Sequence, residues 1–160
     1  MNIRHKHNEK DKNVWISEHL LNQMYLLSMR HYPNEFGGIL VGVQNDNDVI
    51  ISDFEVPNKF DNNKNQFTRH ASKLNKYLHE SYSKSNGKLE YLGEWHTHPN
   101  TNPNFSRNDE ESMKELAEDP KVKTNHPALI ILGVSKKNYD YKLYICFEGK
   151  LKHLNQITKI

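Results

Sequence analysis

Residues 89–99 read Leu-Glu-Tyr-Leu-Gly-Glu-Trp-His-Thr-His-Pro, a run that begins like a core strand and ends in two histidines. Alternate residues of a strand point to the same side of a sheet. His96 and His98 can therefore face one metal ion together, and a rigid strand would fix the positions of both rings. Pro99 ends this strand, because proline cannot donate a hydrogen bond to a sheet.

A third metal ligand follows shortly after the two histidines, at Asp109, where the next helix is expected to begin. Two imidazoles and one carboxylate can fill three corners of a zinc tetrahedron and leave the fourth open for water. Three protein ligands with an open position are typical of catalytic zinc, whereas structural zinc is usually held by four. The sequence therefore predicts one zinc ion per chain, with hydrolysis as the chemistry.

Ser106 and Asp109 also fit a second interpretation, a helix-capping box, in which a hydroxyl and an acid three residues later satisfy free N–H groups. The two interpretations are compatible, since Ser106 can cap the helix and still present its hydroxyl to the site. A His-x-His pair alone is weak evidence in a chain with 10 histidines. His5 and His7 form such a pair in a polar segment without supporting residues, and we expect no site there.

A hydrolytic zinc site needs a general base to accept the proton of the attacking water. Two glutamates are candidates. Glu35 directly precedes the apolar run expected as a strand over residues 36–43, so a neighbouring strand end could bring it to the metal. Glu94 lies two residues before His96, and strand alternation places it on the histidine face. Spacing does not choose between them, and Glu94 could instead orient a histidine ring through its free N–H.

Hydrophobic periodicity and turn residues predict an α/β (α+β) fold in a single domain, with one mixed sheet and helices packed against it. Residues 1–13 are expected to form a polar, solvated arm, residues 14–160 the domain, and the residues from Lys150 onward a short tail. The polar segment 57–69 is either a binding loop that orders on substrate or a disordered connection. The expected helices cover residues 18–31, 71–85 and 106–118, and the expected strands cover residues 14–16, 36–43, 49–54, 89–96, 128–134 and 141–147.

The composition limits the partners and the compartment. The 160 residues include 22 basic and 20 acidic ones, a net charge of +2 that is too balanced for a nucleic-acid-binding surface. The single cysteine, Cys146, excludes an internal disulfide and zinc sites built from several thiolates, and it is expected in the core. No signal peptide or membrane-length apolar run is visible, so we expect a cytoplasmic protein without a membrane partner.

The motif residues resemble those of the JAMM (MPN-plus) metallopeptidases, also known by their JAB domain. The signature of that family is an upstream Glu, then His-x-His-Pro, six residues, Ser, two residues and Asp. The resemblance extends over residues 14–148. This chain matches the signature throughout, at Glu35, His96-Thr97-His98-Pro99, Ser106 and Asp109.

The resemblance implies a role for each residue of the motif. Zinc would be held by His96, His98 and Asp109. Glu35 would accept the proton of the attacking water, and Ser106 would stabilise the oxyanion that forms on the scissile carbonyl. The resemblance also implies a fold like that of cytidine deaminases, a curved mixed sheet flanked by helices.

The local run 93–99 is most similar to bacterial JAB peptidases from mobile elements and anti-phage operons. In CBASS operons such peptidases act beside E1- and E2-like enzymes and remove a nucleotidyltransferase (CD-NTase) from its conjugates. The resemblance therefore implies a protein substrate, cleaved at the peptide or isopeptide bond at the C-terminus of a ubiquitin-like or otherwise conjugated protein. Phe105 departs from the family, many of whose members carry proline before the serine.

Three other functions compete with a peptidase. Many MPN domains lack the ligands and serve as non-catalytic scaffolds, but this chain retains all five functional positions. A nucleobase deaminase needs His-x-Glu and Pro-Cys-x-x-Cys, which a chain with one cysteine cannot supply. A RadC-like, DNA-associated member of the superfamily would usually read His-Asn-His-Pro-Ser-Gly, whereas residues 96–101 read His-Thr-His-Pro-Asn-Thr. The zinc metallopeptidase is the favoured interpretation.

Overall fold

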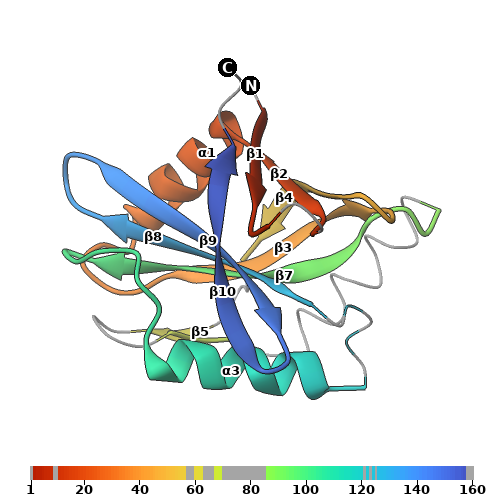
Figure 1. The fold of residues 1–160 in the computed structure, drawn as a ribbon. Helices are drawn as coiled ribbons and strands as arrows, with labels where there is room; N and C mark the ends of the chain where they lie inside the picture. The colour runs from red at the N-terminus through yellow and green to blue at the C-terminus, as the bar shows by residue number, and fades with distance from the viewer. Residues whose placement is uncertain are drawn as a thin grey trace.

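The described part of the computed structural model contains an eight-stranded sheet, a two-stranded sheet and two helices (Figure 1). It describes residues 2–8, 11–56, 60–62, 67–69, 86–120, 122, 124 and 126–157. The helices are α1 (Glu18–Ser28) and α3 (Arg107–Glu118). The strands are β1 (Asn2–Lys6), β2 (Asn13–Ser17), β3 (Gly37–Gln44), β4 (Asp48–Glu55), β5 (Phe60–Asn62), β6 (Phe67–Arg69), β7 (Glu90–Pro99), β8 (Ala128–Val134), β9 (Tyr139–Phe147) and β10 (Lys150–Ile157).

Eight of these strands close into a barrel in the order β1-β10-β9-β8-β7-β3-β4-β2. The pairs β2–β4 and β7–β8 are parallel and the other pairs are antiparallel, so the sheet is mixed, as predicted. A curved mixed sheet with helices against it agrees with the expected architecture. Closure of the sheet was not expected, and the likeness to cytidine deaminases stays a prediction.

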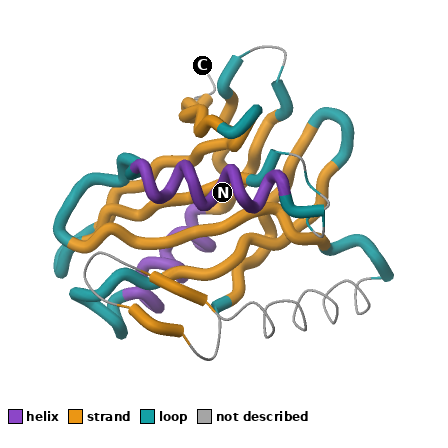
Figure 2. The backbone as a smooth tube through the Cα atoms, turned by 90° about the horizontal axis from the view of Figure 1, so that it is seen from below, coloured by secondary structure: helices purple, strands orange, loops and turns teal. Residues whose placement is uncertain are grey.

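Alternation along the strands sorts apolar side chains between two layers on opposite sides of the sheet. The larger layer lies inside the barrel and includes Leu40, Leu132 and Leu143 together with the buried face of α1. The smaller layer lies outside and packs Ile131 and Tyr144 against α3. Figure 2 shows α3 lying across one side of the strands and α1 behind them. The outer layer under α3 is where the candidate site lies.

Two predictions about the ends of the chain are wrong. Residues 2–6 of the expected solvated arm form β1, which pairs with both β2 and β10. The expected tail from Lys150 is β10, paired with β9 as well. Both strands lack a clear apolar pattern in the sequence, because only one side of each faces the barrel interior and the other side carries polar residues. In β1 the buried position is a histidine, His5.

The remaining elements differ from expectation mainly at their boundaries. The first helix ends at Ser28 rather than at residue 31, and turns follow it. The segment 57–69, expected to have no regular structure, contains the paired strands β5 and β6. The helix predicted over residues 71–85 lies outside the described residues. Cys146 is buried, as expected. Within the part of the chain that is described, neither helix is long and apolar enough to cross a membrane.

His5 occupies the barrel interior as a neutral, fully paired side chain, with a relative exposure of 2%. Its Nδ1 lies 3.3 Å from the carbonyl oxygen of Val14, so Nδ1 carries the hydrogen and donates. Its Nε2 therefore accepts from the hydroxyl of Tyr141 at 2.8 Å. Burial lowers the pKa of His5, an effect that the backbone contacts to Val14 and Ile3 only partly offset.

This pairing predicts that acid destabilises the fold partly through His5. The unfolded chain takes up a proton on this residue near pH 6.5, whereas the folded chain does so only at lower pH. The unfolded state then binds more protons, so the free energy of unfolding decreases as the pH falls through about 6.5. Urea unfolding of wild type and His5→Gln between about pH 7 and pH 5.5 should show a shallower decrease in the variant. Equal pH dependences would contradict this role of His5.

Candidate metal centre

His96, His98 and Asp109 come together at the junction of β7 and α3. Their ligand atoms all lie within 4.8 Å of one another. The two histidines lie on the outer side of β7, because His96 pairs across the sheet with Ile131, a residue of the layer beneath α3. Asp109 comes from the first turn of α3. A strand and a helix terminus thus bring three candidate ligands to one point.

The separations between these ligand atoms fit a tetrahedral metal. The Nε2 of His96 lies 3.2 Å from the Nε2 of His98 and 3.1 Å from one carboxylate oxygen of Asp109. The other carboxylate oxygen lies 3.3 Å from the Nε2 of His98. Ligands about 2.0 Å from a tetrahedral zinc ion are about 3.3 Å apart. The donor set of two imidazole nitrogens and a carboxylate therefore fits zinc in both chemistry and spacing.

Glycines on the neighbouring strands allow the backbone to pack closely around the histidines. Gly37 pairs with His96, and a Cβ at Gly37 would lie 2.0 Å from the carbonyl oxygen of Trp95. Gly133 pairs with His98, and a Cβ there would lie 2.5 Å from the carbonyl oxygen of Thr101. Either clash would move the backbone. The chain leaving β7 can therefore turn tightly over β8 toward α3.

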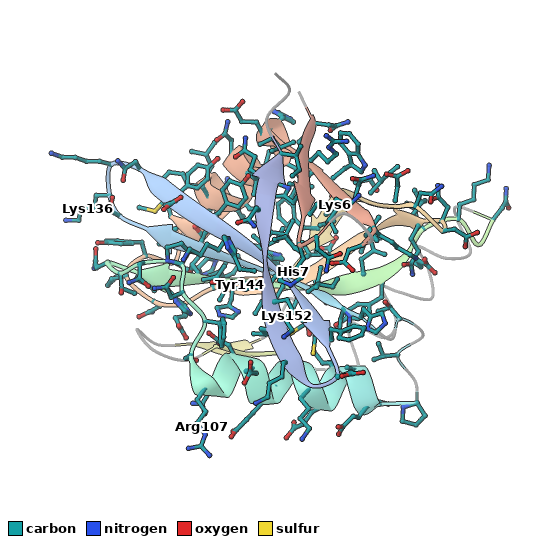
Figure 3. All side chains as sticks on the ribbon, viewed as in Figure 1. Lys6, His7, Arg107, Lys136, Tyr144 and Lys152 are labelled. Atoms are coloured by element: carbon teal, nitrogen blue, oxygen red, sulfur yellow. The ribbon has the colours of Figure 1, made fainter. Side chains whose placement is uncertain are left out.

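The predicted capping box is confirmed at the start of α3. The backbone N–H of Asp109 donates to Ser106 Oγ at 3.1 Å, and the backbone N–H of Ser106 donates to Asp109 Oδ2 at 2.7 Å. The carboxylate therefore caps the helix and contacts both histidines. Figure 3 shows the neighbouring Arg107 directed away from the sheet. The first turn of α3 thus presents Asp109 to the site and Arg107 to solvent.

A carbonyl oxygen sets the orientation of His98. The Nδ1 of His98 lies 3.3 Å from the backbone oxygen of Asn102, which can only accept a hydrogen bond. In the neutral form of His98 the hydrogen is then on Nδ1, which leaves the lone pair of Nε2 available for a metal ion. Metal-binding histidines commonly donate their second N–H in this way. Sequence reasoning did not identify Asn102, because any residue can supply a backbone carbonyl.

Glu35 is the fourth ionisable group at the centre, with one carboxylate oxygen 4.0 Å from His98 Nε2. Its side chain has a relative exposure of 12%, close to those of the three candidate ligands. Glu94, the competing candidate, is buried on β7 opposite Ile39 and Leu129. Glu35 thus lies next to the candidate ligands. Sequence spacing could not distinguish it from Glu94 as the candidate base.

Burial and mutual contacts determine the charges of these groups. Burial by itself would raise the pKa of Asp109, but hydrogen bonds from His96, His98 and the Ser106 backbone outweigh it and hold the pKa well below its ordinary value. Burial also opposes protonation of His98, yet the contact with Asp109 and the charge of Glu35 raise its pKa overall. Burial raises the pKa of Glu35, and the two histidines partly offset this. Asp109 is therefore ionised, whereas Glu35 is a stronger base than an exposed glutamate.

Side chains of β9 anchor the loop between β7 and α3. The hydroxyl of Tyr144 donates to the carbonyl oxygen of Pro103 at 2.9 Å, and the ring packs edge-on against Phe105. Lys142 Nζ donates to the side chain of Asn104 at 2.5 Å. Figure 3 labels Tyr144 among the side chains of the sheet. No sequence signal could have identified these anchors, which lie about 40 residues from the loop.

Comparison with known proteins assigns the chain to a family. Residues 17–145 match the family described as prokaryotic homologs of the JAB domain (Prok-JAB). A protein of Enterobacter hormaechei subsp. hoffmannii named CD-NTase/cGAS isopeptidase is 31% identical over 123 residues, covering 75% of this chain and 67% of that protein. A protein of the same name from Vibrio cholerae serotype O1 is 31% identical over 139 residues, covering 82% of this chain and 81% of that protein.

The fold is also similar to a solved structure, that of protein DSY2949 from Desulfitobacterium hafniense. The TM-score is 0.66, the sequence identity is 20%, and the match covers 86% of each chain. At this identity the likeness concerns the fold alone. The family match covers most of the chain and includes Glu35, both histidines of β7, Ser106 and Asp109. This chain therefore belongs to the prokaryotic JAB-domain family.

Proposed function

We propose that this protein is a zinc-dependent isopeptidase. One observation carries the proposal: the ligand atoms of His96, His98 and Asp109 lie within 4.8 Å of one another, with the Glu35 carboxylate 4.0 Å from His98 Nε2. Placing several ionisable groups together where water is partly excluded costs stability. A non-catalytic scaffold would gain nothing from such an arrangement. Family membership supports a hydrolase of the JAB type.

Each residue of the centre has a proposed role in amide hydrolysis. A zinc ion at this centre would supply Lewis-acid activation of water and of the scissile carbonyl. Asp109, ionised at neutral pH, offsets the positive charge of the metal. Glu35 accepts the proton of the attacking water and passes it to the leaving amine nitrogen, a role that its raised pKa suits.

Ser106 completes the proposed machinery as an oxyanion donor. Its Oγ accepts from the Asp109 backbone, which leaves the hydroxyl hydrogen available to donate. A hydrogen bond to the oxygen of the scissile carbonyl becomes stronger as negative charge develops there. Such a donor contributes about 3 kcal/mol in comparable enzymes. The hydroxyl therefore caps α3 and serves catalysis at the same time.

The proposed substrate class rests on the names of similar proteins. Four curated proteins similar to this chain carry the name CD-NTase/cGAS isopeptidase. This name supports a conjugated protein as the substrate, and we propose a CD-NTase released from its conjugate by cleavage of the bond at the C-terminus of the conjugated protein, as part of an anti-phage system. The buried free thiol of Cys146 is compatible with the reducing cytoplasm in which such conjugates would occur.

The metal part of the proposal predicts that Asp109→Asn loses zinc. The amide can still accept the N–H of Ser106, so the helix cap survives, but the anionic ligand is gone. Elemental analysis after dialysis should find about one zinc ion per wild-type chain and little in the variant. Glu111→Gln, an exposed change on the same helix, is the matched control and should retain zinc. Stoichiometric zinc in Asp109→Asn would remove this residue from the ligand set.

The catalytic part predicts that Glu35→Gln retains zinc but cleaves about 100- to 10,000-fold more slowly, because the base is gone and the ligands remain. The assay is release of a CD-NTase from a conjugate made by its E1- and E2-like enzymes, followed by gel electrophoresis. Glu94→Gln is the matched comparison and should retain most activity. An inactive Glu94→Gln beside an active Glu35→Gln would reverse the assignment of the base.

A further inference from the structure

The four groups of the centre are not fixed in the same way. His96 and His98 lie on a strand paired on both sides, and Asp109 lies in a capped helical turn. Glu35, in contrast, lies in the irregular segment between α1 and β3, whose sheet pairing begins only at Gly37. A general base must be positioned as accurately as the ligands. Other contacts must therefore fix this segment.

Thr97 makes the first of these contacts, through the residue that follows Glu35. The backbone N–H of Phe36 donates to Thr97 Oγ1 at 3.0 Å, and the backbone N–H of Thr97 donates to the carbonyl oxygen of Phe36 at 2.8 Å. Thr97 is 1% exposed and lies on the side of β7 opposite the two histidines. It does not face the site, so its effect on the chemistry has to pass through Glu35.

The ring of Phe36 makes this anchor rigid. It is buried in the barrel interior, stacked on His31 with centroids 4.0 Å apart and packed edge-on against Trp95. Both backbone polar groups and the side chain of Phe36 are therefore fixed. The backbone of Glu35, one residue earlier, is held relative to β7 by this arrangement.

Asn100 makes a second contact with the same segment from the outside. Its side-chain oxygen accepts a hydrogen bond from the hydroxyl of Tyr32, three residues before Glu35. Asn100 has a φ of 59°, in the left-handed region, and its backbone N–H donates to Val134 at 2.7 Å. The Glu35 segment is therefore attached to the histidine-bearing chain at both ends.

We propose that Thr97 and Asn100 are positioning residues that set the place of Glu35 relative to the metal ligands. Thr97 acts from the core and Asn100 from the surface, and both belong to the chain that carries the ligands. The segment bearing the base therefore follows any movement of that chain. The expected effect of these residues on turnover rests on the proposed function. Their effect on the position of Glu35 can be measured separately.

The buried contact is tested by Thr97→Val, which has nearly the same shape but no acceptor for the Phe36 N–H. We expect kcat to fall about 10- to 100-fold with KM nearly unchanged, because a displaced base affects chemistry more than binding. Zinc content should stay at the wild-type value. Thr97→Ser keeps the acceptor and should restore kcat. Thr124→Val, a similar change at a buried threonine between α3 and β8, should have no effect on kcat.

The surface contact is tested by Asn100→Gly and Tyr32→Phe. Glycine adopts a positive φ without strain, so Asn100→Gly removes only the side chain. Each variant should lower kcat about three- to tenfold, and the double variant should be no worse than either single one, because all three lack the same contact. Additive effects would show that the two residues act independently. If Thr97→Val does not fold, these two substitutions, which lie outside the fully buried core, decide the question.

A crystal structure of zinc-loaded Thr97→Val separates this inference from the proposed function. Displacement of the Glu35 carboxylate from His98, with the ligands in place, would support the inference even if no conjugate were cleaved. Glu35 unmoved, with wild-type kcat, would overturn the inference and leave the isopeptidase proposal intact. Wild-type protein that binds zinc but cleaves no conjugate would overturn only the proposed function.

Discussion

The carboxylate of Asp109 makes the contacts on which the candidate centre depends. One oxygen lies against His96, and the other lies against His98 and the backbone N–H of Ser106. A partly buried charge is stable only when such partners compensate its lost hydration. Because the same group caps α3, the position of the helix and the geometry of the centre depend on each other.

This dependence matters because the contacts of α3 with the sheet are few. Met113 is buried, Leu116 and Ala117 are partly buried against the same outer layer, and Glu110 accepts a hydrogen bond from the backbone N–H of Leu151. Its start is held by the cap and by the loop that Tyr144 and Lys142 anchor to β9. The barrel, in contrast, is stabilised by a large apolar interior in which α1 takes part. The fold thus separates the groups that provide most of the core from the groups that provide the chemistry.

Local patterns made the cluster of candidate metal ligands predictable, whereas long-range strand pairing could not be predicted from the sequence. Strand alternation brought His96 and His98 to one side, and the offset to Asp109 matched a helix start, so three residues within a short segment predicted the cluster. Spacing could not identify Glu35 as the base. Its segment is held against β7 by the hydrogen bond between Phe36 and Thr97, which are 61 residues apart in the sequence. The resemblance to a known family supplied that choice instead.

Closure of the barrel was missed for a related reason. It depends on pairing between β1 and β10, in which Arg4 lies opposite Ile157. Neither strand has a strong apolar alternation, and the fully buried residue of β1 is His5, whose pairing with Tyr141 makes its burial possible. A polar residue that is buried because of a distant partner cannot be told from a surface residue in the sequence.

Zinc-edge anomalous diffraction from crystals of the zinc-loaded wild-type protein tests the central claim most directly. We expect a single peak bonded to His96 Nε2, His98 Nε2 and the carboxylate of Asp109, with no fourth protein ligand and with Glu35 close by. No peak between these residues, or a peak whose fourth position is occupied by another side chain, would contradict a catalytic zinc centre in this protein.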